Sequence, residues 1–166
     1  MDDARLKAYG AAAAVFALDR ITKSLIVSKF SFFDSYKVIP GFFEIIRSQN
    51  RGVAFGIFND STSEWRTTLL VIASLVAVVA VSVMLWNARK LDRLSLWGLA
   101  LILGGAAGNV FDRIVSGHVT DFLLFYIRDY QWPAFNMADS AIVVGAAFVV
   151  LELFRDWKEH PTHERA

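Results

Sequence analysis

The chain has 166 residues, of which 55% are hydrophobic, and its formal net charge at pH 7 is +1. This length suits one domain, and the hydrophobic share exceeds the roughly 45–50% of soluble domains. The near-neutral charge, with no basic stripe along the sequence, gives no indication of nucleic-acid binding. The chain contains no cysteine, which excludes a thiol nucleophile, disulfide bonds and a cysteine-ligated zinc ion.

Four apolar runs predict membrane-spanning helices, at about residues 8–27, 67–86, 96–114 and 137–155. The second is the clearest, because residues 67–86 are 20 uncharged positions in a row. A helix needs about this number to cross a hydrocarbon core of ~30 Å. The first run also resembles the apolar core of a secretory signal peptide, but no small-x-small cleavage site follows Leu18. The apolar pattern resumes after it, so we expect an uncleaved first span.

The segment between the first two runs is rich in β-branched and aromatic residues. Residues 38–46 and 53–58 have the composition of short strands, and Pro40 interrupts the first of them. They predict a small β-structure, at about residues 30–58, that lies on the membrane surface. The expected fold class is an all-α polytopic membrane protein, one domain over residues 1–166, with four transmembrane helices and this outer β-structure between the first and second.

Charges in the loops predict the orientation in the membrane. The connection 87–95 carries three basic residues, whereas the longer connection 114–137 carries one, Arg128. The positive-inside rule then places 87–95 and both chain termini in the cytoplasm. Five basic residues in the 39-residue segment 28–66 weaken the asymmetry without reversing it.

Polar side chains recur at one depth of the predicted helices. Asp19 and Lys23 lie four residues apart, on one helix face, and can pair there. With both termini inside, the first, third and fourth helices all bring polar groups toward the outer side: Asp19, Lys23, Asn109, Asp112, Arg113, Asn136 and Asp139, with Asp121 on the outer connection. Ionisable groups at such positions are costly unless they face a protein interior or water. Their common depth therefore predicts one shared site.

The two aspartates that flank the outer connection, Asp121 and Asp139, predict acid–base chemistry. Two neighbouring carboxylates cannot easily both ionise, so one of them keeps its proton. The ionised partner can take a proton from water while the protonated one donates a hydrogen bond to a scissile carbonyl. Coupled carboxylates titrate as a pair, so the sequence assigns no individual roles. Asn109, Asn136 and Arg113 can hold the carboxylates, a substrate backbone or a developing oxyanion. We expect a membrane-embedded aspartic peptidase that needs no metal or other cofactor.

Other chemistries have less support in the sequence. His118 lies near Ser116 and Asp121, but the nucleophile elbow of a serine hydrolase is missing. No HExxH metal motif is present. A proton- or ion-coupled transporter also carries intramembrane carboxylates, although its polar groups should lie near the midplane. Apart from Glu152, none falls in the inner half here. A structural membrane subunit would leave the aspartates and asparagines without a purpose.

Five sequence blocks occur together along residues 8–155: DRITK at 19–23, NRGVAFG at 50–56, GNVFDR at 108–113, VTDF at 119–122 and FNMAD at 135–139. In this order and spacing they resemble the motifs of bacterial lipoprotein signal peptidase, also called signal peptidase II. The resemblance implies an aspartic endopeptidase of the bacterial inner membrane. It would remove signal peptides from prolipoproteins by cutting before a cysteine that carries diacylglycerol.

The resemblance also assigns roles to residues. It makes Asp121 and Asp139 the catalytic pair. It gives supporting or substrate-binding roles to Asp19, Lys23, Asn50, Gly52, Asn109, Asp112, Arg113 and Asn136. The expected partners are lipid-modified prolipoproteins and membrane lipids, with no nucleic acid, and the expected state is a monomer. No metal or cofactor is expected.

Overall fold

The computed structural model describes residues 3–51, 64–87 and 91–159. These residues form four long helices and four strands. The helices are α1 (Asp3–Lys29), α2 (Glu64–Trp86), α3 (Arg93–Ser116) and α4 (Met137–Glu159). The strands are β1 (Ser35–Ile39), β2 (Phe43–Asn50), β3 (Val119–Ile127) and β4 (Tyr130–Gln131). Gly52 and the strand expected at 53–58 lie outside the described residues.

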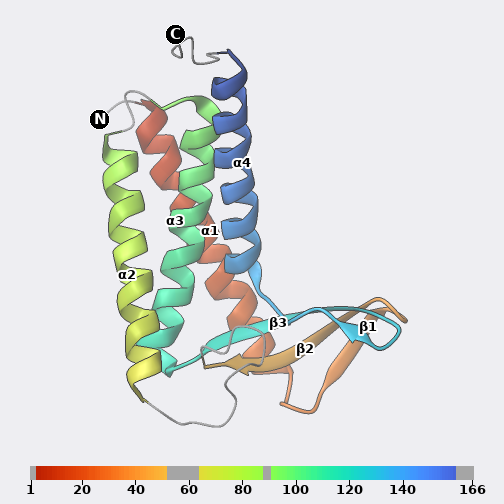
Figure 1. Cartoon of the computed structure of the whole chain (residues 1–166). Coiled ribbons are helices and arrows are strands. Elements are labelled where there is room, and N and C mark those ends of the chain that lie inside the picture. Colours follow the sequence, from red (N-terminus) through yellow and green to blue (C-terminus); the bar gives the residue numbers. More distant parts are fainter. Residues whose placement is uncertain (1–2, 52–63, 88–90, 160–166) are drawn as a thin grey trace.

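Helix α3 lies at the centre of the bundle and packs against α1, α2 and α4, most extensively against α4 (Figure 1). Glycines permit this close packing. A Cβ atom on Gly98 would lie 2.6 Å from the carbonyl oxygen of Gly145 in α4. A Cβ atom on Gly104 would lie 2.4 Å from the carbonyl oxygen of Ala12 in α1. Small residues at these crossings let the helix backbones touch, as in membrane helix pairs.

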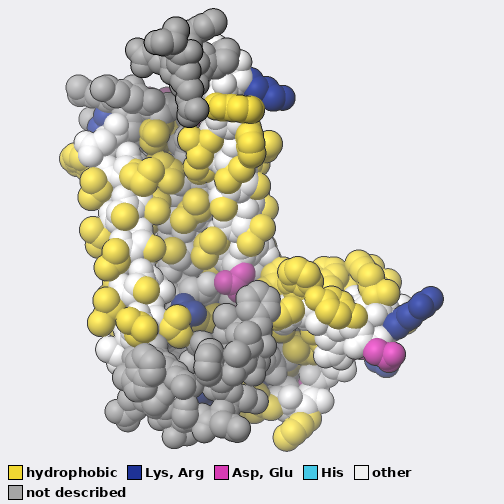
Figure 2. Space-filling model, in the orientation of Figure 1, with side chains coloured by type: hydrophobic (Ala, Val, Ile, Leu, Met, Phe, Trp, Pro, Cys, Tyr) yellow, Lys and Arg dark blue, Asp and Glu magenta, His cyan; other side chains and the backbone are white. Residues whose placement is uncertain are grey.

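On the face of the bundle that Figure 2 shows, hydrophobic side chains cover most of the described surface of the helices. Among the described residues, three helices are long and apolar enough to cross a membrane: α2, α3 and α4. Helix α1 has the length, at 27 residues, but its apolar run contains Asp19, Arg20 and Lys23. Of the four predicted membrane-spanning helices, three therefore have the length and apolar composition to cross a membrane.

The four strands form one antiparallel sheet in the order β1-β2-β3-β4. It projects sideways from one end of the bundle, while the N- and C-termini lie at the other end (Figure 1). Residues 38–46, with the interruption predicted at Pro40, span the end of β1, a turn and the start of β2. In this turn Gly41 has a φ of 80°. That left-handed conformation favours glycine.

The predicted β-structure between the first two helices is present as β1 and β2, but the sheet also takes two strands from the segment between α3 and α4. Residues 114–137 were expected as the connection between the third and fourth helices, but β3 and β4 lie within them, and β3 pairs with β2 over most of its length. The fold is consequently helical with a four-stranded sheet rather than all-α. The strand β3 is buried or half-buried on both faces until its last residue, so it shows no alternation of polar and apolar residues. Its partner β2 is about 70 positions away in the chain, which no local pattern reveals.

Candidate active site

The start of α4 lies against β3 because Phe135 extends the sheet by one residue. The amide nitrogens of Phe122 and Leu123 both donate to the carbonyl oxygen of Phe135, at 3.0 and 2.9 Å. The amide of Phe135 donates in return to the carbonyl oxygen of Leu123 at 3.1 Å. This pairing brings Asn136, the next residue, beside Asp121 of β3.

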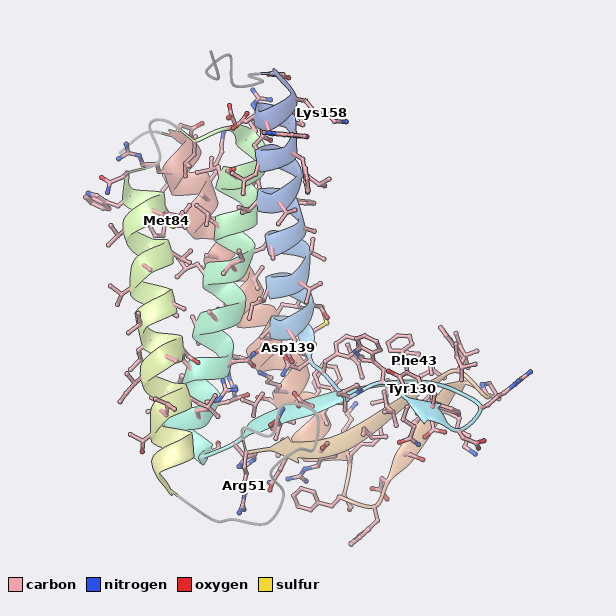
Figure 3. The ribbon with its side chains drawn as sticks, in the orientation of Figure 1. Phe43, Arg51, Met84, Tyr130, Asp139 and Lys158 are labelled. Atoms are coloured by element: carbon pink, nitrogen blue, oxygen red, sulfur yellow. The ribbon has the colours of Figure 1, made fainter. Side chains whose placement is uncertain are left out.

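Asn136 and Asp139 cap the first turn of α4 reciprocally. The Oδ1 atom of Asn136 accepts from the backbone nitrogen of Asp139 at 3.0 Å, and Asp139 Oδ2 accepts from the backbone nitrogen of Asn136 at 3.2 Å. This is a capping box in which the residue before the helix and its third residue satisfy each other's free amides. The cap fixes the direction of the Asp139 carboxylate, which lies where α4 meets the sheet (Figure 3).

Asn136 also reaches the second aspartate. Its Nδ2 atom donates to Asp121 Oδ1 at 2.7 Å, and its side chain is fully buried. One asparagine therefore hydrogen-bonds both carboxylates of the predicted pair, through its side chain to Asp121 and through its backbone to Asp139. The structure brings together two residues that are 18 positions apart in the sequence.

Helix α3 supplies a second asparagine to the pair. Asn109 Nδ2 donates to Asp139 Oδ1 at 2.7 Å, so both oxygens of Asp139 accept hydrogen bonds. The other end of the amide, Asn109 Oδ1, lies 3.0 Å from Lys23 Nζ and 3.4 Å from Asn136 Nδ2.

A buried ionic network from α1 supports Asn109. Lys23 Nζ lies 2.8 Å from Asp19 Oδ2 and 2.8 Å from Asp112 Oδ2, and these three side chains are almost fully buried. Asp112 Oδ1 accepts from Arg20, whose guanidinium also lies over the Phe111 ring, 4.6 Å from its centroid. Buried charges of this kind persist only when paired and hydrogen-bonded.

Asp19 connects this network to α4. Its Oδ1 atom accepts from the backbone nitrogen of Ala138 at 3.1 Å, in the first turn of α4. A negative charge at this end of a helix is favourable, because the free amides there are the positive end of the helix dipole. Gly108 makes room for the carboxylate, since a Cβ atom there would lie 2.5 Å from Asp19 Oδ2.

The remaining predicted residues lie around the pair. Asn50 faces the same side of the sheet as Asp121, because it pairs with Val119, and its side chain hydrogen-bonds the Asp121 carboxylate. Arg113 Nη1 donates to the carbonyl oxygen of Asn109 at 3.3 Å, and its charge acts on Asp139 and Asp121. Gly52 cannot be placed, since it lies outside the described residues.

Comparisons with known proteins agree with this geometry. Residues 11–155 match the family model described as signal peptidase (SPase) II. The chain belongs to the signal peptidase II family. It is 63% identical over 155 residues to the lipoprotein signal peptidase of Solibacter usitatus, covering 93% of this chain and 94% of that protein. It is 45% identical over 147 residues to the lipoprotein signal peptidase of Oleidesulfovibrio alaskensis, covering 89% of this chain and 94% of that protein.

Two solved structures of bacterial membrane enzymes share the fold. One, at 2.3 Å resolution, has a TM-score of 0.81 and 27% sequence identity, and the match covers 96% of this chain and 94% of that one. The other, at 1.9 Å resolution, has a TM-score of 0.78 and 29% identity, and the match covers 90% of this chain and 94% of that one. The family is one of proteases, so the chain is a hydrolase, as the sequence predicted.

In this signal peptidase II family member, burial sets the protonation of Asp121. The side chain lies on the sheet and is 3% exposed. The pKa of Asp121 is raised to about 6. Burial is the largest cause, and the nearby charge of Asp139 is the second. Hydrogen bonds from Asn136 and Asn50 and the charge of Lys23 oppose the rise. The carboxyl therefore holds its proton to a higher pH than an ordinary aspartate, as general acid–base work near neutrality requires.

One residue of the buried ionic network was not among the predicted site residues. Arg20 was not singled out, although it pairs with Asp112; its place one turn before Lys23 in the DRITK block was the available signal. The serine-triad alternative finds no support. His118 Nδ1 lies 2.8 Å from the backbone carbonyl oxygen of Ser116 rather than from its hydroxyl.

Three carboxylates of the described residues could approach a metal ion: Asp92, Glu152 and Asp156. They lie near the C-terminal end of α4, whereas Asp139 lies in its first turn. Arg155 pairs with Glu152 at 3.4 Å. Among the described residues, this group therefore lies at the opposite end of α4 from Asp139.

Proposed function

We propose that this chain removes the signal peptide from prolipoproteins, by cutting before a cysteine that carries diacylglycerol. The observation that carries the proposal is the hydrogen bonding of both Asp121 and Asp139 by one residue, Asn136. This arrangement supports a catalytic pair of aspartates. The names of the two relatives described above, lipoprotein signal peptidases, support the substrate class.

Asp121 and Asp139 share the work of hydrolysis. The ionised carboxylate takes a proton from a water molecule, and the oxygen of that water attacks the scissile carbonyl carbon. At the same time the protonated carboxyl donates a hydrogen bond to the carbonyl oxygen. The tetrahedral intermediate then breaks its C–N bond, and the leaving amine of the cysteine takes a proton from the pair. No metal is needed for these steps. The raised pKa of Asp121 supports a state with one shared proton up to about pH 6.

Arg113 is suited to hold the substrate. Its Nε atom is buried without a hydrogen-bond partner, and its guanidinium lies near both aspartates. A fixed positive charge at this place can bind a peptide carbonyl or the developing oxyanion. Asn50, on the other side of Asp121, can hold the carboxyl and the peptide backbone together.

The membrane placement that fits this function has four spans. Helix α1 can serve as the fourth because its charges at Asp19 and Lys23 turn inward, while Leu18, Ile21 and Leu25 are exposed on its outer side. Charges inside a membrane protein are tolerated when they face the bundle interior. Both termini then lie in the cytoplasm, and the aspartates face the periplasm at the outer surface of the bacterial inner membrane.

An apolar groove beside the site suits a lipid-modified substrate. It has a volume of about 330 Å³ and is lined by Phe42, Phe125, Tyr126, Ile127, Tyr130, Trp132 and Phe135. The hydroxyl of Tyr126 is engaged by Glu44 at 2.8 Å, so its ring is what the groove presents. Phe135 leads directly into Asn136 of the site. We expect a monomer whose partners are prolipoproteins and membrane lipids, without nucleic acid.

The test is cleavage by the purified protein in detergent of three matched precursors. We expect cleavage of the precursor with diacylglyceryl-cysteine, and none of the unmodified precursor or of one with serine at that position. Two acyl chains anchor far more firmly than one, at ~0.8 kcal/mol per buried methylene. They would hold the scissile peptide bond at the depth of the aspartates, so that a bimolecular encounter becomes an effectively unimolecular reaction. Equal rates on all three precursors would make the protein a general intramembrane peptidase.

A further inference from the structure

We propose that Lys23 is a positioning residue that fixes the orientation of the Asn109 amide, so that its NH₂ group faces Asp139. The proposal rests on the proposed function only in taking Asp139 as half of the working pair. It goes beyond that function because it assigns to a residue of α1 a defined action on a carboxylate of α4, through a residue of α3.

First, the Lys23 ammonium group is held in a fixed position. A protonated lysine has three N–H donors and no acceptor. Lys23 Nζ has three oxygen neighbours, Asp19 Oδ2 at 2.8 Å, Asp112 Oδ2 at 2.8 Å and Asn109 Oδ1 at 3.0 Å. The side chain is 1% exposed, so water does not compete for these donors. Two of these contacts are hydrogen bonds, to Asp19 and to Asn109, and the contact with Asp112 is an ion pair. The ammonium group is thus held from three sides, and one of its N–H donors points at Asn109.

The second step is the choice between the two ends of the amide. The oxygen and nitrogen ends of asparagine have nearly the same shape and differ in what they can bond. In the reversed orientation, an NH₂ group would face the ammonium of Lys23, and the amide oxygen would face Asp139 Oδ1. Both contacts would be repulsive. Lys23 therefore selects the orientation in which Asn109 Nδ2 donates to Asp139 at 2.7 Å.

The third step is the effect on Asp139. One of its oxygens is held by the capping box with Asn136, and the other is held by Asn109. Without Lys23, the amide oxygen of Asn109 keeps only the longer contact with Asn136 Nδ2, at 3.4 Å. The amide then turns more easily, and Asp139 Oδ1 loses its donor although the cap remains. The carboxylate then spends less time in the productive position, while the surfaces that bind substrate are unchanged. The loss should appear in kcat and not in KM.

Arg20 provides the comparison that separates positioning from charge balance. Both Lys23 and Arg20 pair with Asp112, so removing either one leaves that carboxylate with less positive charge. The hydrogen bonds of Arg20 within the described residues run to Asp112 and not to Asn109. If Lys23 acts only as a counter-charge, the two residues should behave alike.

The experiment is a pair of double-mutant cycles on kcat for the lipidated precursor. One cycle combines Lys23→Met with Asn109→Ala, and the other combines Arg20→Met with Asn109→Ala. A hydrogen bond to a charged group is worth about a 10- to 100-fold change in rate. We expect each of Lys23→Met and Asn109→Ala to lower kcat by about that factor, and the double variant to lose no more than about threefold beyond the larger single loss. The Arg20→Met effect should multiply with that of Asn109→Ala.

Multiplying losses in the Lys23 cycle would overturn the proposal, as would equal coupling in both cycles. Lys23→Met leaves two buried carboxylates short of charge and could unfold the protein. The cycle is then repeated with Asp19→Asn added to every member, since asparagine keeps the acceptor for the Ala138 amide without the charge. The unsubstituted protein is a separate control, because its failure to cleave would count against the proposed function and not against the coupling.

Discussion

At the scale of single residues, Asn136 explains why two distant aspartates can act together. It bonds Asp121 with its NH₂ group, caps α4 with its amide oxygen, and accepts the Ser140 amide with its carbonyl oxygen at 3.1 Å. A helix cap normally stabilises a helix by about 1 kcal/mol. Here the capping residue also holds Asp121 of β3 at a fixed distance from Asp139 of α4. The site is therefore held by both the sheet and the helix.

Asp121→Asn and Asp139→Asn should each lower kcat for the lipidated precursor at least about 100-fold, the usual contribution of a general acid or base. Asparagine keeps the shape, and its amide oxygen can still accept the hydrogen bond that Asn136 donates to each aspartate, but it cannot exchange a proton. Exposed Asp129→Asn is the matched control for loss of a negative charge and should keep normal activity. If either active-site variant is folded, by its thermal melt, and keeps more than about a tenth of the activity, that aspartate is not catalytic, since the loss is under ~1.4 kcal/mol.

The raised pKa of Asp121 predicts how activity depends on pH. A carboxyl with a pKa of about 6 is protonated below that pH and ionised above it, so the pair loses its shared proton as the pH rises. We expect kcat/KM to fall on the alkaline side with an apparent pKa near 6 in the free enzyme. Asn50→Ala removes a hydrogen bond that lowers the pKa, and should move this limb to higher pH.

The measurement is kcat/KM in detergent between about pH 5 and pH 9, and it reports the pKa values of the free enzyme. Gln49→Ala is the matched control, because Gln49 lies next to Asn50 in β2 but is exposed. Its alkaline limb should coincide with that of the unsubstituted protein. A limb that moves to lower pH in Asn50→Ala would contradict the assigned hydrogen bond.

At the scale of elements, the site depends on how closely α3 approaches α4. A Cβ atom on Gly105 would lie 2.4 Å from the carbonyl oxygen of Ala138, the residue before Asp139. The two helices also meet at Gly98 and Gly145, farther along α4. The α3–α4 interface thus has two parts. The contact at Gly105 lies beside Asp139, whereas the contact at Gly98 lies away from it.

Gly105→Ala and Gly98→Ala should both destabilise the protein, by about 1–3 kcal/mol, because each added methyl group meets a backbone oxygen that cannot turn aside. Only Gly105→Ala should also lower kcat markedly, since it displaces the first turn of α4. Thermal melts in detergent measure the first effect, and initial rates well below both melting temperatures measure the second. Equal kcat values for the two variants would show that the α3–α4 spacing does not control Asp139.

At the scale of the whole molecule, the site and the termini lie at opposite ends of the helices (Figure 1). The sheet projects at the level of the aspartates, and its lining of aromatic residues lies beside them. In the proposed orientation, which the next experiment tests, a substrate anchored in the outer leaflet would meet the aspartates without crossing the bundle.

Single cysteines test this orientation cleanly, since the chain contains none of its own. Cysteine substitutions at exposed Ser35 and Ser116 should react with a membrane-impermeant thiol reagent in intact spheroplasts. A substitution at Asn87, just beyond the end of α2, should react only after the membrane is opened. The opposite pattern would place the aspartates on the cytoplasmic side and remove the basis for lipoprotein processing there.

The sequence by itself determined the long helices, the depth shared by the polar residues, and the family through its five blocks. These are local signals, since apolar length predicts a span and a charge inside it stands out. The tertiary structure decided the rest. Strand β3 became a strand through pairing with β2, and Asp121 met Asp139 only because Phe135 joins the same sheet. The tertiary structure also decided which amide nitrogen donates to which carboxylate. That choice depends on donors from α1, from α3 and from the start of α4, which only the fold brings together.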